Sequence, residues 1–465
     1  MRILLIFLSF NYLLCFDSIA QKTELTYLEY LAIVKQHHPM ALQAQLIIER
    51  GKANLLSARG GFDPKIQADL SQKFFEGKEY YDKKNGALKV PTWFGLEFEA
   101  GYERNQGQFL SNENNTPSNG LYFAGISVPI GQGLFIDQRR TDLRKAQAFL
   151  EQSEADQILA INDLIFNAGV AYWNWYQAYK NLEIFISALN LAEIRYEAVT
   201  QAASFGDRPI IDTVEAIIQL QNRQIALQEA ELDMKNKAAE LSVYLWQDGT
   251  IPLELNDSTI PQNDISLSSD DAFLFSINIK DSLIEVHPKL KSQEAKVNQL
   301  EFEQRWKAEQ LKPRLNLKYQ PITEAINDNP LSEYSSNNYT FGVQFEFPIF
   351  LRKERGNLNF TKTILSDSRL ELLNAKQQIE VKVNTAINEF ETVQSQVQVF
   401  SRTTQDYFRL LQGERELFDG GESSLFMINS RELGYINAQI KLNELSVKGQ
   451  KARLKAYYAL GVLPN

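Results

Sequence analysis

The chain has 465 residues, of which 23% are charged, and its 48 basic and 58 acidic side chains give a formal net charge of −10. This acidic balance argues against a nucleic-acid partner, because binding to phosphates depends on clustered lysine and arginine. Cys15 is the only cysteine. Disulfides and cysteine metal sites are therefore excluded from the residues that follow it.

The N-terminal segment, 1–20, has the pattern of a secretory signal peptide. Arg2 precedes an apolar run that begins at Ile3, and Ser18-Ile19-Ala20 supplies small residues where a signal peptidase reads. The sequence therefore predicts cleavage after Ala20 and export from the cytoplasm. A transmembrane anchor is the alternative, although the apolar run is short for a helix that needs about 20 apolar residues.

Apolar and polar residues alternate in five later segments. From Thr340 to Phe347, apolar side chains take the odd positions and small or polar ones take the even positions. Strands with one aromatic and one polar face fit a lipid-facing barrel with a wet lumen, although any single strand also fits a soluble sandwich. The predicted strands are about 64–74, 92–103, 120–130, 313–320 and 339–349.

The first group of strands has one alternating segment too many. A chain that leaves and re-enters the same side of a membrane crosses it an even number of times. We therefore expect residues 75–91 to be an excursion or bulge that interrupts one long strand, which leaves four crossing strands. Four strands cannot close a barrel, for which about eight is the practical minimum. Several chains are thus expected to share one barrel.

Two very long helices are expected after the strands. Apolar residues step by 3 and 4 from Ile158 to Leu189, and again from Val383 to Phe400. This spacing is that of heptad a and d positions, and it predicts a coiled-coil seam. No proline interrupts about 137–206 or about 356–420. Each helix is therefore expected to have roughly 65 to 70 residues and to span on the order of 100 Å.

Shorter helices are expected to run back alongside the long ones. The segments 212–245 and 424–460 follow glycine turns and are only a little more than half as long as the helices before them. The missing length is expected to come from short helices at 40–60 and 289–311, stacked end to end on the returning helices.

The same order of elements occurs twice. His38-Pro39 and His287-Pro288 are 249 positions apart (287 − 38), whereas Gly206 and Gly421 are 215 positions apart (421 − 206). A duplication explains both separations if the first copy carries a net insertion after Pro64. The length of this insertion equals the difference between the two separations. The predicted organisation is a signal peptide at 1–20, a first repeat at 21–245 with its helical hairpin at about 137–245, a linker at 246–275, and a second repeat at 276–465 with its hairpin at about 355–461.

These landmarks resemble the TolC-type family of outer-membrane efflux and secretion ducts. The resemblance covers nearly all of the mature chain and includes Leu25-Thr26-Tyr27-Leu28-Glu29 and the two His-Pro pairs, where the family usually has Asn-Pro. It implies an α+β membrane protein, a homotrimer whose chains each give four strands to a 12-stranded β-barrel in outer-membrane lipid. Below the barrel it implies an α-helical coiled-coil barrel through the periplasm, which meets an adaptor (membrane fusion) protein and an inner-membrane pump.

The resemblance also implies where the working residues lie. It places aperture residues at Asp212 and Glu215, although Met427 and Ser430 stand at the equivalent positions of the second copy and put an acidic ring in doubt. A favourable acidic first turn of a helix is the alternative interpretation of both. The turns after the long helices are the candidate adaptor-docking tips, where glycine also permits the positive φ of a tight turn. The candidate tip residues are Phe205, Gly206, Asp207, Arg208, Gly420, Gly421, Glu422 and Ser423.

No residue pattern indicates catalysis, a cofactor or a metal. The three histidines lack an acidic or cysteine cluster at ligand spacing, and there is no phosphate loop or serine elbow. The leading interpretation is a passive exit duct of a tripartite efflux pump or a type I secretion system, with energy supplied by a partner. A non-pore periplasmic or surface coiled-coil protein and a stand-alone uptake channel are the alternatives.

Overall fold

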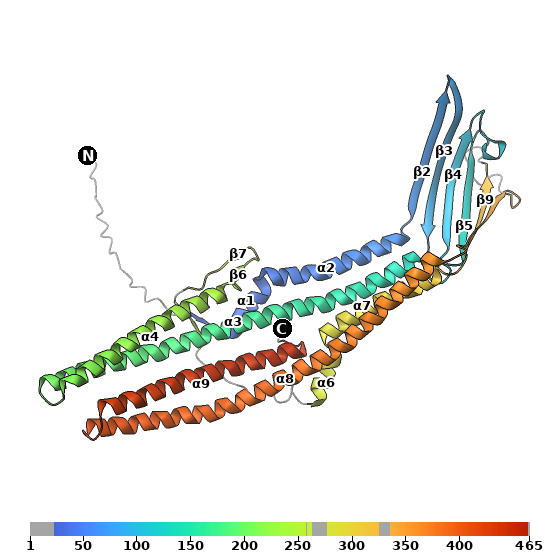
Figure 1. Ribbon diagram of the computed structural model, residues 1–465. Coiled ribbons are helices and arrows are strands. Elements are labelled where there is room, and N and C mark those ends of the chain that lie inside the picture. Colours follow the sequence, from blue (N-terminus) through green and yellow to red (C-terminus); the bar gives the residue numbers. More distant parts are fainter. Residues whose placement is uncertain (1–22, 257, 263–276, 325–334, 464–465) are drawn as a thin grey trace, which may run out of the picture.

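The computed structural model describes residues 23–256, 258–262, 277–324 and 335–463. The molecule is elongated, with a long helical body and a β-sheet that projects from one end (Figure 1). The predicted signal peptide at 1–20 and most of the second half of the predicted linker lie outside the described residues. Within the described ranges, no helix has both the length and the apolar character needed to cross a membrane.

Two long helices form the spine of the body. Helix α3 (Gln138–Ser204) has 67 residues and α8 (Arg352–Asp419) has 68, in agreement with the predicted lengths. Each turns back into a shorter antiparallel helix, α4 (Ile210–Ser242) after α3 and α9 (Leu425–Leu460) after α8. The two hairpins lie side by side (Figure 1).

Short helices continue the returning ones toward the sheet. Helix α2 (Pro39–Arg59) extends the line of α4, and α7 (Pro288–Glu309) extends the line of α9 (Figure 1). The other short elements are α1 (Tyr27–His37), α6 (Ile277–Glu285), the parallel pair β1 (Thr23–Leu25) and β8 (Thr259–Pro261), and the antiparallel pair β6 (Trp246–Gln247) and β7 (Ile251–Pro252).

A histidine stands at each junction between stacked helices. Nδ1 of His38 accepts the backbone N–H of Met40 at 3.1 Å, and Nδ1 of His287 accepts that of Lys289 at the same distance. Each ring therefore caps the first turn of a short helix, as Asn would. The ring of His38 also stacks on Tyr244, just beyond the end of α4, with 5.8 Å between centroids. The two His-Pro pairs thus mark the places where helices join end to end.

The main core lies where α1 crosses α3. Tyr30, Tyr172 and Trp175 are at most 1% exposed and are among the largest fully buried side chains. Tyr172 lies 5.5 Å from Tyr30 and 5.7 Å from Trp175, measured between ring centroids. Its hydroxyl donates to the carbonyl of Leu25 at 2.9 Å, which ties β1 to the long helix.

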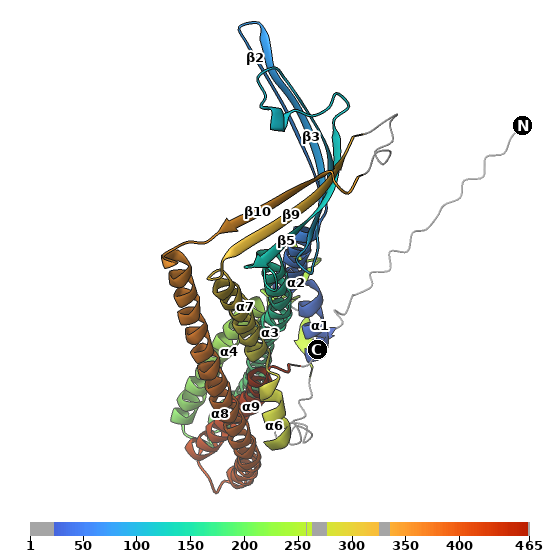
Figure 2. The same ribbon diagram turned by 90° about the vertical axis from the view of Figure 1, so that its right-hand side faces the viewer.

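The projecting sheet has six strands in the order β10-β9-β5-β4-β3-β2, and every neighbouring pair is antiparallel. Figure 2 shows that β9 and β10 diverge strongly from β2 and β3, so the sheet is twisted and curved. The strands are β2 (Lys65–Phe75), β3 (Lys78–Pro91), β4 (Glu97–Gln106), β5 (Leu121–Gly131), β9 (Arg314–Thr323) and β10 (Tyr339–Glu346).

Strand β3 corrects two predictions. Residues 75–91 do not interrupt one long strand, because 78–91 form a strand that pairs with both β2 and β4. The described chain therefore contributes six strands to the sheet, and the expected number of four was wrong. The polar run Asp82-Lys83-Lys84-Asn85 puts hydrophilic side chains on both faces of β3, which hides the alternation that identifies a strand. The first copy then has four strands and the second has two, an even number in each.

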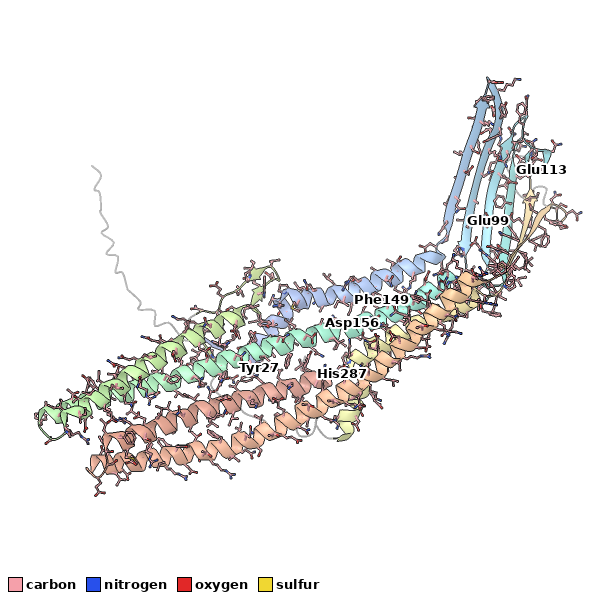
Figure 3. The ribbon with its side chains drawn as sticks, in the orientation of Figure 1. Tyr27, Glu99, Glu113, Phe149, Asp156 and His287 are labelled. Atoms are coloured by element: carbon pink, nitrogen blue, oxygen red, sulfur yellow. The ribbon has the colours of Figure 1, made fainter. Side chains whose placement is uncertain are left out.

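The two faces of the sheet differ in character. One row of cross-strand neighbours is apolar on all five of its strands, and it consists of Val90, Phe98, Ile126, Tyr319 and Phe341. On the polar face, Glu99 (Figure 3) lies 2.8 Å from Nζ of Lys318 and 3.6 Å from Nζ of Lys89, and it accepts a hydrogen bond from Gln320 at 3.1 Å. Glu99 thus joins strands of the first repeat to β9 of the second.

Candidate functional site at the helical tips

Both long helices end in the same turn. Gly206 has φ +82° and Gly421 has φ +78°, in the left-handed region. The N–H of Asp207 donates to the carbonyl of Ala202 at 3.0 Å, and the N–H of Glu422 donates to the carbonyl of Leu417 at 2.8 Å. These bonds are those of a Schellman motif, which satisfies the last carbonyls of a helix. The two tips therefore share one conformation, as the predicted duplication would lead one to expect.

The left-handed glycines lead to a testable expectation about tip stability. We expect Gly206→Ala to lower the free energy of unfolding by about 1 kcal/mol, because a side chain in this region costs about 1–2 kcal/mol. No atom lies within 4 Å of the position that the new Cβ would take, so the cost is conformational. Gly206→Asn should cost less, since Asn tolerates this region. Thermal unfolding of the solubilised protein measures both.

Gly413 provides the matched control. It lies inside α8, has a φ outside the left-handed region, and also has no atom within 4 Å of the place where a Cβ would stand. Gly413→Ala should therefore stabilise the protein by about 0.8–1 kcal/mol through helix propensity. Equal losses from the Ala and Asn variants at position 206 would contradict the conformational explanation.

Arg208 connects the two tips within one chain. Its guanidinium carbon lies 4.1 Å from the centroid of the Phe418 ring at the end of α8, a cation–π contact. Its Nη1 also lies 3.6 Å from the carboxylate of Asp212. Asp212, one of the two predicted aperture residues, therefore forms an ion pair within its own hairpin. This pair orients Arg208, whose guanidinium contacts the other hairpin.

Glu215, the second predicted aperture residue, belongs to a polar network between the hairpins. Its Oε1 accepts a hydrogen bond from Asn429 at 3.0 Å, and Oδ1 of Asn429 accepts one from Arg195 at 3.1 Å. Arg195 also forms a salt bridge with Glu432, in which the side chains are only 12% and 6% exposed. Arg223 lines the same small cavity as this pair. The network joins α3 and α4 to α9 a few turns above the tips.

Sequence reasoning missed Arg195, Asn429 and Glu432, although two of them carried a signal. Glu432 follows Leu425 and Ile428 at spacings of 3 and 4 on the buried stripe of α9. Arg195 occupies a step between the buried residues Ala192 and Val199 of α3. Opposite charges on the apolar stripes of two helices indicate a buried ion pair, since unpaired charges are rarely buried.

The predicted docking residues lie at the free end of the molecule. Phe205, Gly206, Asp207, Gly421 and Glu422 are exposed, while Ser423 is half-buried and donates a hydrogen bond to Glu414. Gly420 is the C-cap of α8. Three neighbouring apolar side chains are also strongly exposed, with Phe205 at 78%, Ile210 at 77% and Ile211 at 69%. In the described part of the chain, no three His, Cys, Asp or Glu residues gather as a metal site would require.

Comparison with known proteins assigns this architecture. Residues 280–461 match the model of the family described as outer membrane efflux protein. No match was found among curated protein sequences.

Solved structures of outer-membrane channels are similar over nearly the whole chain. The CmeC channel of Campylobacter jejuni has 16% identity and a TM-score of 0.64, and the alignment covers 94% of this chain and 85% of that one. VceC of Vibrio cholerae has 13% identity and a TM-score of 0.65, with coverage of 94% and 96%. MtrE of Neisseria gonorrhoeae has 14% identity and a TM-score of 0.65, with coverage of 94% and 89%. At these identities the likeness shows the fold.

Proposed function

Because residues 280–461 belong to the outer membrane efflux protein family and the described chain has the fold of outer-membrane channels, we propose that this protein is a passive exit duct. It serves a tripartite efflux pump or a type I secretion system. The family and its structural relatives are channels rather than enzymes. The energy for transport therefore comes from an inner-membrane pump, reached through a periplasmic adaptor protein.

One combination of features supports the duct most strongly. A sheet with one apolar face continues directly into helices of 67 and 68 residues (Figure 1), each about 100 Å long at 1.5 Å per residue. The sheet fits the outer membrane, and the helices fit a periplasmic extension of this length. A coiled-coil protein without a pore has no need of the apolar sheet face, and an uptake channel has no need of the helices.

The sheet also requires other copies of the chain. A membrane-spanning sheet must be closed, because lipid offers no hydrogen-bond partners to its edges. Six strands are fewer than the roughly eight that can close a barrel. A homotrimer, the assembly implied by the family resemblance, supplies the missing strands and gathers the helical hairpins into one tube.

Single-particle electron microscopy and planar-bilayer recording test the duct together. Protein extracted from outer membranes in mild detergent should form three-fold tubes with a barrel at one end, and it should conduct ions across a bilayer. Deletion should make cells accumulate toxic compounds or fail to secrete a protein. Soluble rods recovered without detergent would contradict the proposal and favour the coiled-coil alternative, whereas a starvation phenotype would favour uptake.

The tip residues give a second test, directed at the adaptor. We expect Ile211→Asp to weaken binding of the adaptor about tenfold or more, because loss of an apolar anchor from an interface costs about 2 kcal/mol. The trimer itself should still form, since Ile211 is 69% exposed. Binding of the purified adaptor from the same organism is the measurement.

Ile194→Asp is the matched control for the tip variant. Ile194 lies on α3 and is 65% exposed, but it stands more than two helical turns before the tip. Its replacement should leave adaptor binding close to that of the unmodified protein. Equal losses from both variants would indicate general damage to the helical body rather than a docking surface at the tip.

A further inference from the structure

The outer edges of the sheet lack partners within the described chain. No described strand pairs with the free edge of β2 or of β10. Six successive antiparallel strands also leave β2 and β10 running in opposite directions. The β2 strand of a second copy can therefore add to β10 and continue the same antiparallel ladder. By repetition, any number of copies can close the sheet without a parallel pair.

We propose that β2 of each copy pairs with β10 of the next and that three copies close a barrel of eighteen strands, three times six. The trimer comes from the proposed function, on which this inference rests. The strand number departs from the twelve that the family resemblance implies. The extra strands are the hairpin β3–β4, which accounts for the excess length of the first repeat.

The residues at the two edges select a register for this interface. Lys65 begins β2 and Glu346 ends β10, and both lie next to the helical body. Pairing Lys65 with Glu346 of the neighbouring copy places opposite charges together on the polar face. A shift by one residue would put every polar side chain of β2 opposite an apolar one of β10.

The same register matches the apolar faces of the two edge strands. Ile66 comes to lie opposite Phe345, Ala68 opposite Val343, and Leu70 opposite Phe341 of the neighbouring copy. The four largest of these side chains are 84%, 67%, 76% and 58% exposed in the single chain, for Ile66, Phe345, Leu70 and Phe341. Cross-strand contacts between aromatic and branched side chains are favourable in sheets. The proposed interface therefore gives these exposed apolar side chains of β2 and β10 cross-strand neighbours on the outer edge of each strand.

The register also closes a barrel of ordinary geometry. Within one copy, the row of cross-strand neighbours that starts at Phe341 on β10 runs across the sheet to Val90 on β3. If the β2–β3 register is extended by one residue, the neighbour of Val90 is position 64, just before β2. In the proposed interface, Phe341 instead lies opposite Leu70 of the neighbouring copy. The row is therefore displaced along β2 by six residues (70 − 64) for every six strands that it crosses. At ~3.3 Å per residue and ~4.8 Å per strand, this stagger gives a strand tilt of about 35°, which lies within the range usual for barrels.

The added hairpin has a consequence for what can leave through the duct. Barrel diameter grows roughly linearly with strand number, so eighteen strands give a diameter about 1.5 times that of twelve at the same tilt. The contacts of Glu99 with Lys89 and Lys318 brace the hairpin against β9 on the polar, lumen-facing side. The exit is thus wider than the family's expected barrel and is suited to cargo of larger cross-section.

Engineered cysteine pairs test the interface in the intact trimer. In a Cys15→Ser background, Gln67→Cys with Gln344→Cys should give a covalent trimer on oxidation, because the proposed register places these positions opposite each other. Lys65→Cys and Asp69→Cys, each combined with Gln344→Cys, cover registers shifted by two residues. Glu103→Cys with Gln344→Cys is the control, since it should crosslink only if the barrel closes through β4 and leaves β2 and β3 outside.

Counting strands by electron cryomicroscopy of the same trimers completes the test. Eighteen strands with a covalent trimer from the Gln67–Gln344 pair is the expected result, whereas a covalent trimer from a shifted pair alone would overturn the proposed register. Twelve strands, or crosslinks from the β4–β10 pair alone, would overturn the inference and leave the duct standing. A protein that is absent from outer membranes, or that forms no trimer, would instead contradict the proposed function, so the two failures are distinguishable.

Discussion

Glu432→Ala is expected to lower the free energy of unfolding by about 3–5 kcal/mol, the usual cost of removing one partner from a buried ion pair. The side chain of Glu432 is 6% exposed and forms a salt bridge with Arg195. It is also a counter-charge for Arg223, whose pKa is lowered by burial while Glu432 opposes that shift. Without Glu432, two guanidinium groups would remain close together between α3, α4 and α9.

The loss should also change the tip end of the proposed duct, where the aperture residues are predicted to lie. The salt bridge between Arg195 and Glu432 holds the second hairpin against the first near the tips. Without it, the two hairpins are free to move apart. Single-channel conductance of the variant in planar bilayers should exceed that of the unmodified protein, and its melting temperature should fall. Asp406→Ala is the control, because the pair Arg409–Asp406 is 74% and 70% exposed and such pairs contribute at most about 1 kcal/mol. Similar effects of both substitutions would refute the buried-network interpretation.

The helices and the family could be predicted from the sequence because their signals are long. A heptad pattern sustained over many turns leaves few alternative structures, and α3 and α8 have the expected lengths. The order of elements repeated around His38-Pro39 and His287-Pro288 indicated the TolC-type family. Residues 280–461 match the model of the outer membrane efflux protein family, as this prediction requires, and the similar channel structures show the same fold over nearly the whole chain.

The strand count could not be predicted because β3 lacks a consistent apolar face. Its first half is polar on both sides around Lys83 and Lys84, whereas Leu88 and Val90 alternate clearly only near its end. Backbone pairing makes this segment a strand, because β3 forms a continuous ladder with β4 from Asp82 to Pro91. Backbone hydrogen bonds stabilise such a strand whatever its side chains, and sequence periodicity does not report them.

The positions of the tips could be predicted from the glycine turns, but the contacts between the two tips could not be predicted. Gly206 and Gly421 could be recognised because few residues other than glycine adopt a positive φ. The stacking of Arg208 on Phe418 joins residues 210 positions apart (418 − 208), and no local pattern indicates it. The roles of Asp212 and Glu215 at an aperture stay a prediction, with their contacts inside one chain now defined.

The second large effect concerns pH and the helix junction at His287 (Figure 3). Burial lowers the pKa of His287 to about 4, the hydrogen bond to the backbone of Ala459 opposes that shift, and Lys382 adds to it. Burial lowers the pKa of His38 in the same way at the other junction. A proton on either ring would remove the Nδ1 acceptor that caps the next helix and would place a positive charge at a helix N-terminus, where the dipole is already positive.

The direction of the pH effect follows from these two states. The unfolded histidine, with a pKa of about 6.5, takes up a proton before the folded one does, so stability from this group is complete above pH ~6.5 and falls as the pH is lowered toward ~4. For His287 the loss amounts to a few kcal/mol at most, because its pKa falls from the usual value of about 6.5 to about 4 on folding.

His287→Asn isolates this contribution, because Asn keeps an N-cap acceptor and does not titrate. Melting temperatures at pH 7.5 and pH 4.5 should differ less in the Asn variant than in the unmodified protein, although carboxylates titrate equally in both. His287→Ala loses the cap as well and should be destabilised at both pH values. If the Asn variant kept the full pH dependence, the titrating group would lie elsewhere, and the histidine would act only as a cap. If the dependence shrinks as expected, the departure from Asn-Pro makes the stacking of α7 on α9 sensitive to the acidity of the compartment.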